Sequence, residues 1–299
     1  MKTTAKSLTS YGNCTLVQLE VRPESEFSFK PGGPEIRNGG LIISESAGGV
    51  VGKLVAVNNT ASFLLLTDAD VLTGAKQNRV LNRPVLLAPF SKTMLDVSCI
   101  ERGRWHYTTQ NFSSPSAAAD PDLRKSKAAS VSDYLFHIAE ESQTQHIVWS
   151  KIASKMHEDS FSSDTENYSD LVSHKAAKQK SAFPLFEPES GCNGLAVLTA
   201  GKITCVDIFG TAESYLHYFP GLRDAAFLQS VPGKREKETD IHEASYRTLE
   251  FLDHFELSEK TADTGYTGAG SLFLRDSISV VGFELECSGQ LIHCGIFGK

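Results

Sequence analysis

A run of polar side chains stands between two apolar stretches in "TGAKQNRVLN", residues 73–82. Gln77 and Asn78 are amides that both donate and accept hydrogen bonds, and Arg79 carries a planar guanidinium suited to carboxylate or phosphate. Together with Lys76, these residues predict the recognition of a polar, anionic ligand. The alternative is a surface turn in which Asn78 bonds its own backbone and Arg79 pairs with a neighbouring acidic residue.

A second polar motif, "VSCIERGRW", follows at residues 97–105. Trp105 offers a face on which a base or sugar can stack, while Arg102 and Arg104 can hold an anion. Glu101 is a candidate acid or base. In the alternative interpretation Trp105 anchors the edge of a sheet and the arginines neutralise adjacent acids.

Three residues are candidates for acid–base catalysis: Asp70, Glu101 and His293. Asp207 and His293 each end an apolar strand, and a histidine there can be a general base if a carboxylate orients it. In "QLIHCGIF" the alternation puts His293 opposite the more apolar face, so we expect it to point away from the main core and meet Asp70 or Glu101. A structural histidine is the alternative. No HxxH or HExxH spacing occurs, so the sequence predicts no metal site.

Taken together, the two motifs resemble the signature of one family, ARPP-1. The similarity extends to Asp70, "QHIVW", "VDIFG" and "GQLIHCGIF", so it spans nearly the whole chain as one domain, residues 1–299. The family name records an association with ADP-ribosylglycohydrolase and rhodanese-phosphatase-type proteins. The resemblance therefore implies a setting in ADP-ribose or phosphate chemistry, but no established reaction. Ile100 and Arg102 stand where Val and Gln are commoner, which leaves the polar framework intact and alters the local charge.

The elements that must position these residues indicate an α+β fold, with a β-rich part at residues 1–112, a polar and helical insert at 113–185 and an α/β part at 186–299. A hairpin near Pro89-Phe90 is expected to bring the two motifs together. The Ser, Ala and Pro-rich "SSPSAAADPDLRKSKAAS" reads as a mobile or weakly helical connection. In contrast, "QHIVWSKIASKMHED" has apolar residues every four positions and predicts a helix packed on the sheet.

Hairpins are predicted around Gly201 and Gly289, and Thr211 is expected to cap a helix that Pro220 interrupts or kinks. The charged "GKREKETD" reads as a solvated linker, followed by an amphipathic helix at "IHEASYRTLEFLDHF".

Composition limits the classes of partner. Lys and Arg total 29 against 36 Asp and Glu, which gives a net charge of −7. This charge does not favour general nucleic-acid binding, but it is compatible with a local basic patch. The chain lacks an apolar run of about 18 residues and a signal-like amino terminus, which predicts no membrane association and a cytoplasmic location. The six cysteines show no CxxC spacing and are expected to be buried free thiols, Cys99 included.

The leading hypothesis is a protein that binds a phosphate- or ribose-containing small molecule in nucleotide or ADP-ribose metabolism. The alternatives are a hydrolase or transferase acting on such a ligand, in which Arg79 and Arg104 stabilise developing charge, and a protein-interaction scaffold. If Arg79 binds ligand, Arg79→Lys should impair function far more than folding. The pattern specifies no cofactor and no oligomeric state.

Overall fold

The computed structural model describes residues 2–46, 50–114, 117–135, 142–231 and 240–299. Within these ranges the chain forms three β-sheets and a set of helices, with a strand-rich first third and helices in the middle. This arrangement confirms the predicted α+β class. The expected linker "GKREKETD" lies almost entirely outside the described residues.

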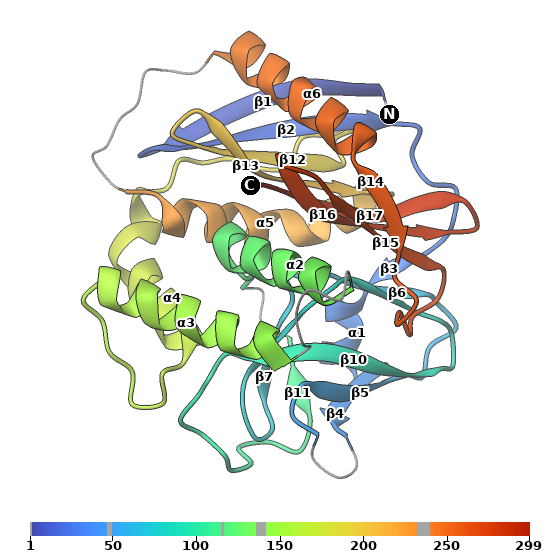
Figure 1. Cartoon of the computed structure of the whole chain (residues 1–299), viewed down its shortest axis with the longest axis vertical. Helices are drawn as coiled ribbons and strands as arrows, with labels where there is room; N and C mark the ends of the chain where they lie inside the picture. Colours follow the sequence, from blue (N-terminus) through green and yellow to red (C-terminus); the bar gives the residue numbers. More distant parts are fainter. Residues whose placement is uncertain (1, 47–49, 115–116, 136–141, 232–239) are drawn as a thin grey trace.

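The largest sheet has eight strands, and every neighbouring pair is antiparallel. In spatial order its strands are β1 (Lys2–Tyr11), β2 (Cys14–Arg22), β12 (Gly194–Thr199), β13 (Lys202–Phe209), β17 (Gln290–Gly298), β16 (Val280–Cys287), β15 (Ser271–Asp276) and β14 (Glu259–Ala262). Segments from both ends of the sequence therefore share one sheet (Figure 1). The hairpins predicted around Gly201 and Gly289 are confirmed as β12–β13 and β16–β17.

Strand β1 was not predicted from the sequence. Its residues, "KTTAKSLTSY", are mostly polar and none of them is buried. The strand lies at the edge of the sheet and pairs with β2 alone, so it needs no apolar face of its own.

A second sheet has six strands in the order β11 (Phe112–Ser113), β7 (Val71–Gly74), β8 (Arg79–Leu81), β10 (Lys92–Cys99), β5 (Lys53–Asn58) and β4 (Leu41–Glu45). A third consists of β3 (Lys30–Pro31), β6 (Leu64–Leu66) and β9 (Val85–Leu87). The hairpin predicted near Pro89-Phe90 is wrong, because β9 bonds to β6 whereas β10 bonds to β5 and β8. The chain there passes from one sheet to another instead of folding back on itself.

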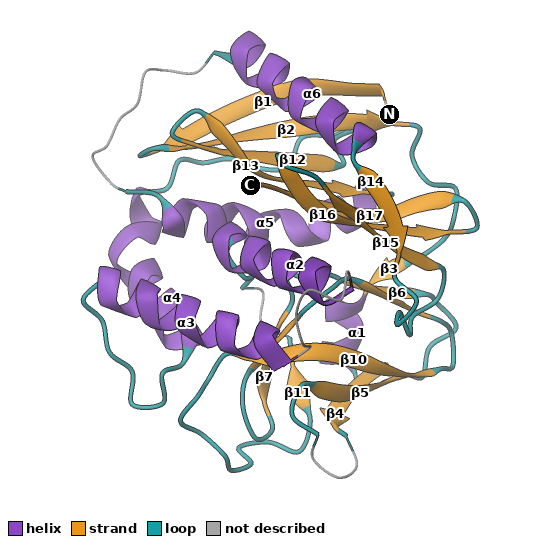
Figure 2. Ribbon diagram, viewed as in Figure 1, coloured by secondary structure: helices purple, strands orange, loops and turns teal. Residues whose placement is uncertain are grey.

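The helices are α1 (Gly32–Asn38), α2 (Pro121–Leu135), α3 (Ser142–Glu158), α4 (Tyr168–Gln179), α5 (Ala212–Gln229) and α6 (Ile241–Leu257), with a short 3-10 helix at Lys180–Ala182. Helix α6 covers one face of the eight-stranded sheet, and α2 and α5 cover the other (Figures 1 and 2). Helices α2 and α5 thus lie between this sheet and the six-stranded sheet. Because both of its faces are covered, the large sheet has inner strands that are buried on both sides.

Helix α3 confirms the predicted apolar stripe. Val148, Ile152 and Met156 are buried and pack with Val80 and Ile100 of the six-stranded sheet region. The amphipathic helix predicted at "IHEASYRTLEFLDHF" is likewise confirmed as α6.

The Ser, Ala and Pro-rich connection was expected to be mobile or weakly helical, and from Pro121 onward it forms the regular helix α2. The Asp120 side chain accepts a hydrogen bond from the backbone N–H of Leu123 at 2.9 Å, and Pro121 begins the helix, as proline readily does. Arg124 and Lys127 are fully buried within it. The helix was not predicted with certainty because its buried face carries charged residues instead of a continuous apolar stripe.

Helix α5 begins as predicted, with the Thr211 hydroxyl accepting from the backbone N–H of Ser214 at 3.3 Å. Pro220 does not end the helix, which continues to Gln229. Burial of Tyr218, Phe219 and other residues on both sides of the proline stabilises the helix despite the missing N–H.

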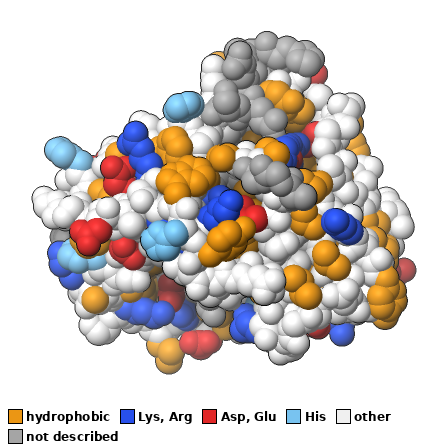
Figure 3. All heavy atoms as spheres, turned by 90° about the horizontal axis from the view of Figure 1, so that it is seen from below, with side chains coloured by type: hydrophobic (Ala, Val, Ile, Leu, Met, Phe, Trp, Pro, Cys, Tyr) orange, Lys and Arg blue, Asp and Glu red, His pale blue; other side chains and the backbone are white. Residues whose placement is uncertain are grey.

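The described helices include none that is long and apolar enough to span a membrane. On the face seen in Figure 3, acidic, basic and hydrophobic side chains are mixed, without a broad area of one charge among the residues drawn in colour. All six cysteines are free and buried, as expected.

Candidate functional site

The two polar motifs lie side by side, as predicted, although for a different reason. Strands β7 and β8 form a hairpin whose turn carries the first motif, and the end of β10 pairs with β8 so that Cys99 lies opposite Arg79. The second motif follows β10 directly and therefore meets the turn of the first.

A closed hydrogen-bond network joins the motifs. Glu101 Oε2 accepts from Arg104 Nη2 at 2.6 Å and from the backbone N–H of Asn78 at 3.1 Å. Asn78 Oδ1 accepts from Arg104 Nη2 at 3.2 Å and from the backbone N–H of Gly74 at 3.0 Å. Burial would raise the pKa of Glu101, but the hydrogen bonds from Arg104 and Asn78 outweigh it and hold the pKa below its ordinary value.

Arg79 is also buried in this region, with 2% of its surface exposed. Its Nη1 donates to Gln77 Oε1 at 2.9 Å, and Nη2 lies 3.6 Å from the Glu45 carboxylate. Gln77 Nε2 in turn donates to the carbonyl oxygen of Glu101 at 2.7 Å. The polar groups that the sequence offered to a ligand therefore bond largely to one another.

Three of the predicted ligand residues lie outside this network. Trp105 is 56% exposed, Arg102 stacks over the Trp149 ring at 5.5 Å, and Lys76 Nζ lies 5.3 Å from the centre of the Tyr107 ring. The set predicted to act together is thus divided between a buried network and the protein surface.

Asp70 occupies a different environment from the other motif residues. Its Oδ2 accepts from the Thr67 backbone N–H at 2.6 Å, the Thr67 hydroxyl at 3.1 Å and the Tyr218 hydroxyl at 3.1 Å. All of these bonds go to Oδ2, and no hydrogen bond joins Oδ1 to another described residue. Burial raises the pKa of Asp70 to about 6, because these hydrogen bonds only partly offset the loss of water.

A cavity of about 170 Å³ opens beside Asp70. Its wall includes Arg37 from α1, Ser114 after β11, and His217 and Tyr218 from α5. Burial, reinforced by the charge of Arg37, lowers the pKa of His217 and favours its neutral form. Asp70 is 8% exposed and lines this cavity.

A buried ion-pair network lies behind Asp70, around Arg124 of α2. The guanidinium donates through Nε and Nη2 to Asp68 at 2.8 and 3.0 Å, and through Nη1 and Nη2 to Asp207 at 2.8 and 2.6 Å. Gly295 leaves room for it, since a Cβ there would lie 3.3 Å from Arg124 Nη2. Burial disfavours the Asp207 carboxylate, but Arg124 outweighs this effect and holds the Asp207 pKa well below its ordinary value.

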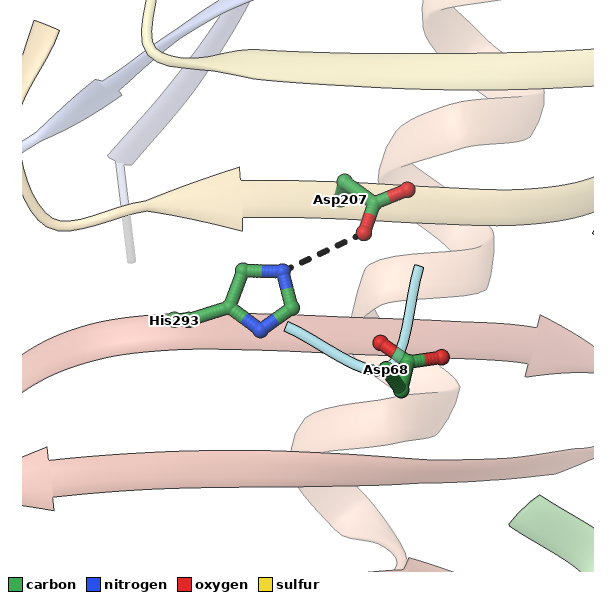
Figure 4. Close-up of side chains that lie close together, drawn as sticks. All are labelled: Asp68, Asp207 and His293. Carbon is green, nitrogen blue, oxygen red and sulfur yellow. Dashed lines mark hydrogen bonds and ion pairs between the residues drawn. The ribbon is translucent and has the colours of Figure 1, made fainter. Parts of the chain in front are cut away.

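His293 belongs to the same network. Its Nε2 lies 3.2 Å from Asp207 Oδ1, and the two side chains project toward each other from β17 and β13 (Figure 4). A carboxylate only accepts, so Nε2 carries the proton of this bond. The expectation that His293 points away from the core and meets Asp70 or Glu101 is wrong: it is fully buried, because α2 and α5 cover its side of the sheet.

The donor atoms of Asp68, Asp207 and His293 lie within 4.8 Å of one another, a spacing that a metal ion can bridge. No sequence spacing predicted this convergence, because the three residues come from distant segments. The Arg124 guanidinium already binds both carboxylates, so the protein supplies its own cation there. We therefore interpret the cluster as an ion-pair network.

Lys127, one turn along α2, extends this network toward the six-stranded sheet. It is fully buried, and its Nζ donates to the carbonyl oxygens of Asp68, at 2.7 Å, and Leu81. Burial lowers the pKa of Lys127 to about 7. Perturbed ionisable groups thus cluster around the segment from Asp68 to Asp70, which is typical of functional sites.

Six residues of this region were not predicted from the sequence: Arg37, Ser114, His217, Tyr218, Arg124 and Lys127. Two of them could have been found from the sequence. Arg124 and Lys127 are three residues apart, so they lie on the same face of a helix as the apolar residues Ala128 and Val131. That face is the buried face of α2. The cavity residues carry no such local signal, since they meet only in the folded chain.

The fold and this site define an α+β protein with a buried carboxyl group beside a small, arginine-bearing cavity. A family model, the ARG and Rhodanese-Phosphatase-superfamily-associated Protein domain (ARPP-1), matches residues 2–297. The chain therefore belongs to the ARPP-1 family, which confirms the resemblance. Comparisons with curated proteins and with solved structures gave no match.

Proposed function

We propose that this protein binds a small phosphate- or ribose-containing molecule in the cavity beside Asp70. The observation that carries the proposal is that Arg37 and Asp70 line the same cavity. The guanidinium attracts an anion, and the carboxyl group together with His217 and Ser114 can bond hydroxyl groups.

The volume of the cavity limits the ligand. Drug-sized ligands occupy pockets of roughly 300–1,000 Å³, whereas this cavity measures about 170 Å³. A phosphate group or a sugar phosphate is therefore a better match than a complete dinucleotide. If ADP-ribose is the ligand, only one of its ends enters the cavity.

The charge around the cavity supports the same class of ligand. Arg37 makes no ion pair with another described residue, so its charge is available to a ligand. Neutral His217 can donate one hydrogen bond and accept another. We also propose a cytoplasmic location, since six buried free thiols suit a reducing compartment.

The second candidate is a hydrolase or transferase acting on the same ligand. The pKa of Asp70, about 6, favours this candidate, because a carboxyl group near that value exchanges protons at neutral pH. Catalytic roles for Glu101 and His293 stay predictions. Neither residue lines the cavity, and each is bonded to another side chain.

The test is a thermal-shift screen with inorganic phosphate, ribose 5-phosphate and ADP-ribose. A ligand at about 100 times its dissociation constant adds roughly 2.7 kcal/mol to stability. Arg37→Gln should abolish the shift, while Arg247→Gln, on α6 and outside the cavity, should preserve it. A shift that survives Arg37→Gln would show that the ligand binds elsewhere, and no shift with any probe would contradict the proposal.

Turnover separates the two candidates. Products of the bound compound would be sought by mass spectrometry with the wild type and with Asp70→Asn, which keeps size and hydrogen bonding but cannot exchange protons. Binding without products supports the binding protein; products that disappear in Asp70→Asn support the enzyme.

A further inference from the structure

We propose that the cavity selects a phosphate group that carries a proton, recognised by Asp70 Oδ1, and that it rejects sulfate. The inference rests on the proposed function and names the ligand class for the same cavity. It follows from what each oxygen of Asp70 can bond.

The two oxygens of Asp70 are not equivalent. Oδ2 already accepts hydrogen bonds from the backbone and hydroxyl of Thr67 and from Tyr218, whereas no hydrogen bond joins Oδ1 to another described residue. An ionised carboxylate only accepts hydrogen bonds. A ligand atom placed against Oδ1 must therefore carry a hydrogen, unless Asp70 itself is protonated.

Arg37 brings an anion to the same cavity. A fully deprotonated anion such as sulfate would face the Asp70 carboxylate with lone pairs and negative charge on both sides, an unfavourable contact. A phosphate monoester loses its second proton near pH 6, and inorganic phosphate keeps an O–H well above that pH, so each can donate to Oδ1 while it holds that proton. Phosphate thus satisfies Arg37 and Asp70 together, and sulfate satisfies only Arg37.

The surroundings of Asp70 match its acidity to that of phosphate. Burial, with a smaller contribution from Asp68, disfavours the carboxylate, the Thr67 and Tyr218 hydrogen bonds favour it, and the pKa of Asp70 is about 6. Lys127 adds positive charge when it is protonated, and Arg37 and His217 share the cavity wall. With similar acidities, the ligand and Asp70 can share one proton at neutral pH.

Selectivity should therefore depend on pH. With a pKa of about 6, roughly 3% of Asp70 is protonated at pH 7.5 and roughly 90% at pH 5.0. Sulfate needs the protonated form, so its apparent affinity should rise roughly thirtyfold between these pH values. Inorganic phosphate, which keeps an O–H at both pH values, should bind about thirtyfold more tightly than sulfate at pH 7.5 and nearly equally at pH 5.0.

The experiment is isothermal titration calorimetry of inorganic phosphate and sulfate at pH 7.5 and pH 5.0. In Asp70→Asn the amide oxygen can replace Oδ2 toward Thr67, which turns the amide N–H toward the cavity as a donor. This variant should bind both anions within about threefold of each other at either pH. It retains His217, so any pH effect of that residue remains and can be subtracted. Asp253→Asn, an exposed change on α6, should behave as wild type.

The outcomes separate the two proposals. Phosphate preference that disappears in Asp70→Asn supports both. Equal binding of phosphate and sulfate at pH 7.5, abolished by Arg37→Gln, overturns the Asp70 selectivity and leaves the anion cavity standing. Failure of both anions to bind the wild type overturns the selectivity, while a thermal shift with ribose 5-phosphate or ADP-ribose would still uphold the proposed function.

Discussion

The hydroxyl of Tyr218 lies 3.1 Å from Oδ2 of Asp70 and 2.9 Å from the carbonyl oxygen of Leu65. A tyrosine hydroxyl has one proton, so it donates fully to only one of these two acceptors at a time. An ionised Asp70 competes for that proton more strongly than the carbonyl does. The protonation of Asp70 is thereby linked to the packing of α5 against β6.

Tyr218→Phe should raise the pKa of Asp70 above about 6, because it removes a hydrogen bond that favours the carboxylate. The measurement is the pH titration of the Asp70 carboxyl carbon by NMR, assigned by comparison with Asp70→Asn. Tyr246→Phe, an exposed change on α6, is the matched control. An unchanged titration in Tyr218→Phe would contradict the role of the hydroxyl.

Asp70 should make stability depend on pH. Its pKa is raised from 3.8 to about 6 on folding, so the native state keeps a proton that the unfolded chain has lost. The contribution of Asp70 to the free energy of unfolding is fully present below pH 3.8 and is lost as the pH rises through about 6. At about 1.36 kcal/mol per pKa unit, this contribution amounts to roughly 3 kcal/mol.

Urea unfolding of wild type and Asp70→Asn from pH 4 to 7.5 would measure this pH-dependent contribution of Asp70 to stability. The wild type should lose free energy of unfolding relative to the variant as the pH rises. Parallel curves would show that Asp70 has an ordinary pKa.

Arg79→Lys should destabilise the fold, in contrast to the expectation drawn from the sequence. Arg79 is 2% exposed, and lysine cannot replace a fork that bonds Gln77 and faces Glu45. The expected loss is about 2 kcal/mol by chemical denaturation. Arg102→Lys, at an exposed site, should change stability by less than about 0.5 kcal/mol. A melting temperature unchanged in Arg79→Lys would return Arg79 to the list of ligand residues.

Arg124→Met should cost roughly 3–5 kcal/mol, because it leaves two buried carboxylates without their cation. Combining it with Asp68→Asn and Asp207→Asn should recover part of that loss, since the uncompensated charges are removed. Lys125→Met, next to it on the same helix, should have little effect. A triple variant no more stable than Arg124→Met would show that the charges are not the cause.

Regular amphipathic patterns predicted much of the fold, as the α3 stripe and the hairpins at Gly201 and Gly289 illustrate. Strand pairing between distant segments was not predictable in this way. The pattern of β9 and β10 is that of a hairpin, but their partners, β6, β5 and β8, are chosen by the packing of the whole chain.

In the candidate site, too, residues with a local sequence signal were predicted, and residues brought together by tertiary packing were not. Asp70 was recognised from its type and its place before the motif, and it does line a cavity. Arg37 and His217 were not recognised from the sequence, because only tertiary packing brings α1 and α5 to Asp70. Arg79 and Arg104 were predicted to bind a ligand, but their guanidinium groups already donate hydrogen bonds within the protein. Arg79 donates to Gln77, and Arg104 donates to Asn78 and Glu101. The sequence does not contain these tertiary contacts.

The order of strands in the large sheet has a consequence for synthesis on the ribosome. Strand β2 can pair with β1 as soon as it emerges, but β13 lacks its neighbour β17 until residues 290–298 have been made. At about 5–20 residues per second, that leaves the β13 edge uncovered for several seconds after it appears. Such an unpaired edge is where nascent chains aggregate, so newly made copies of this protein should depend on chaperones until β17 joins the sheet.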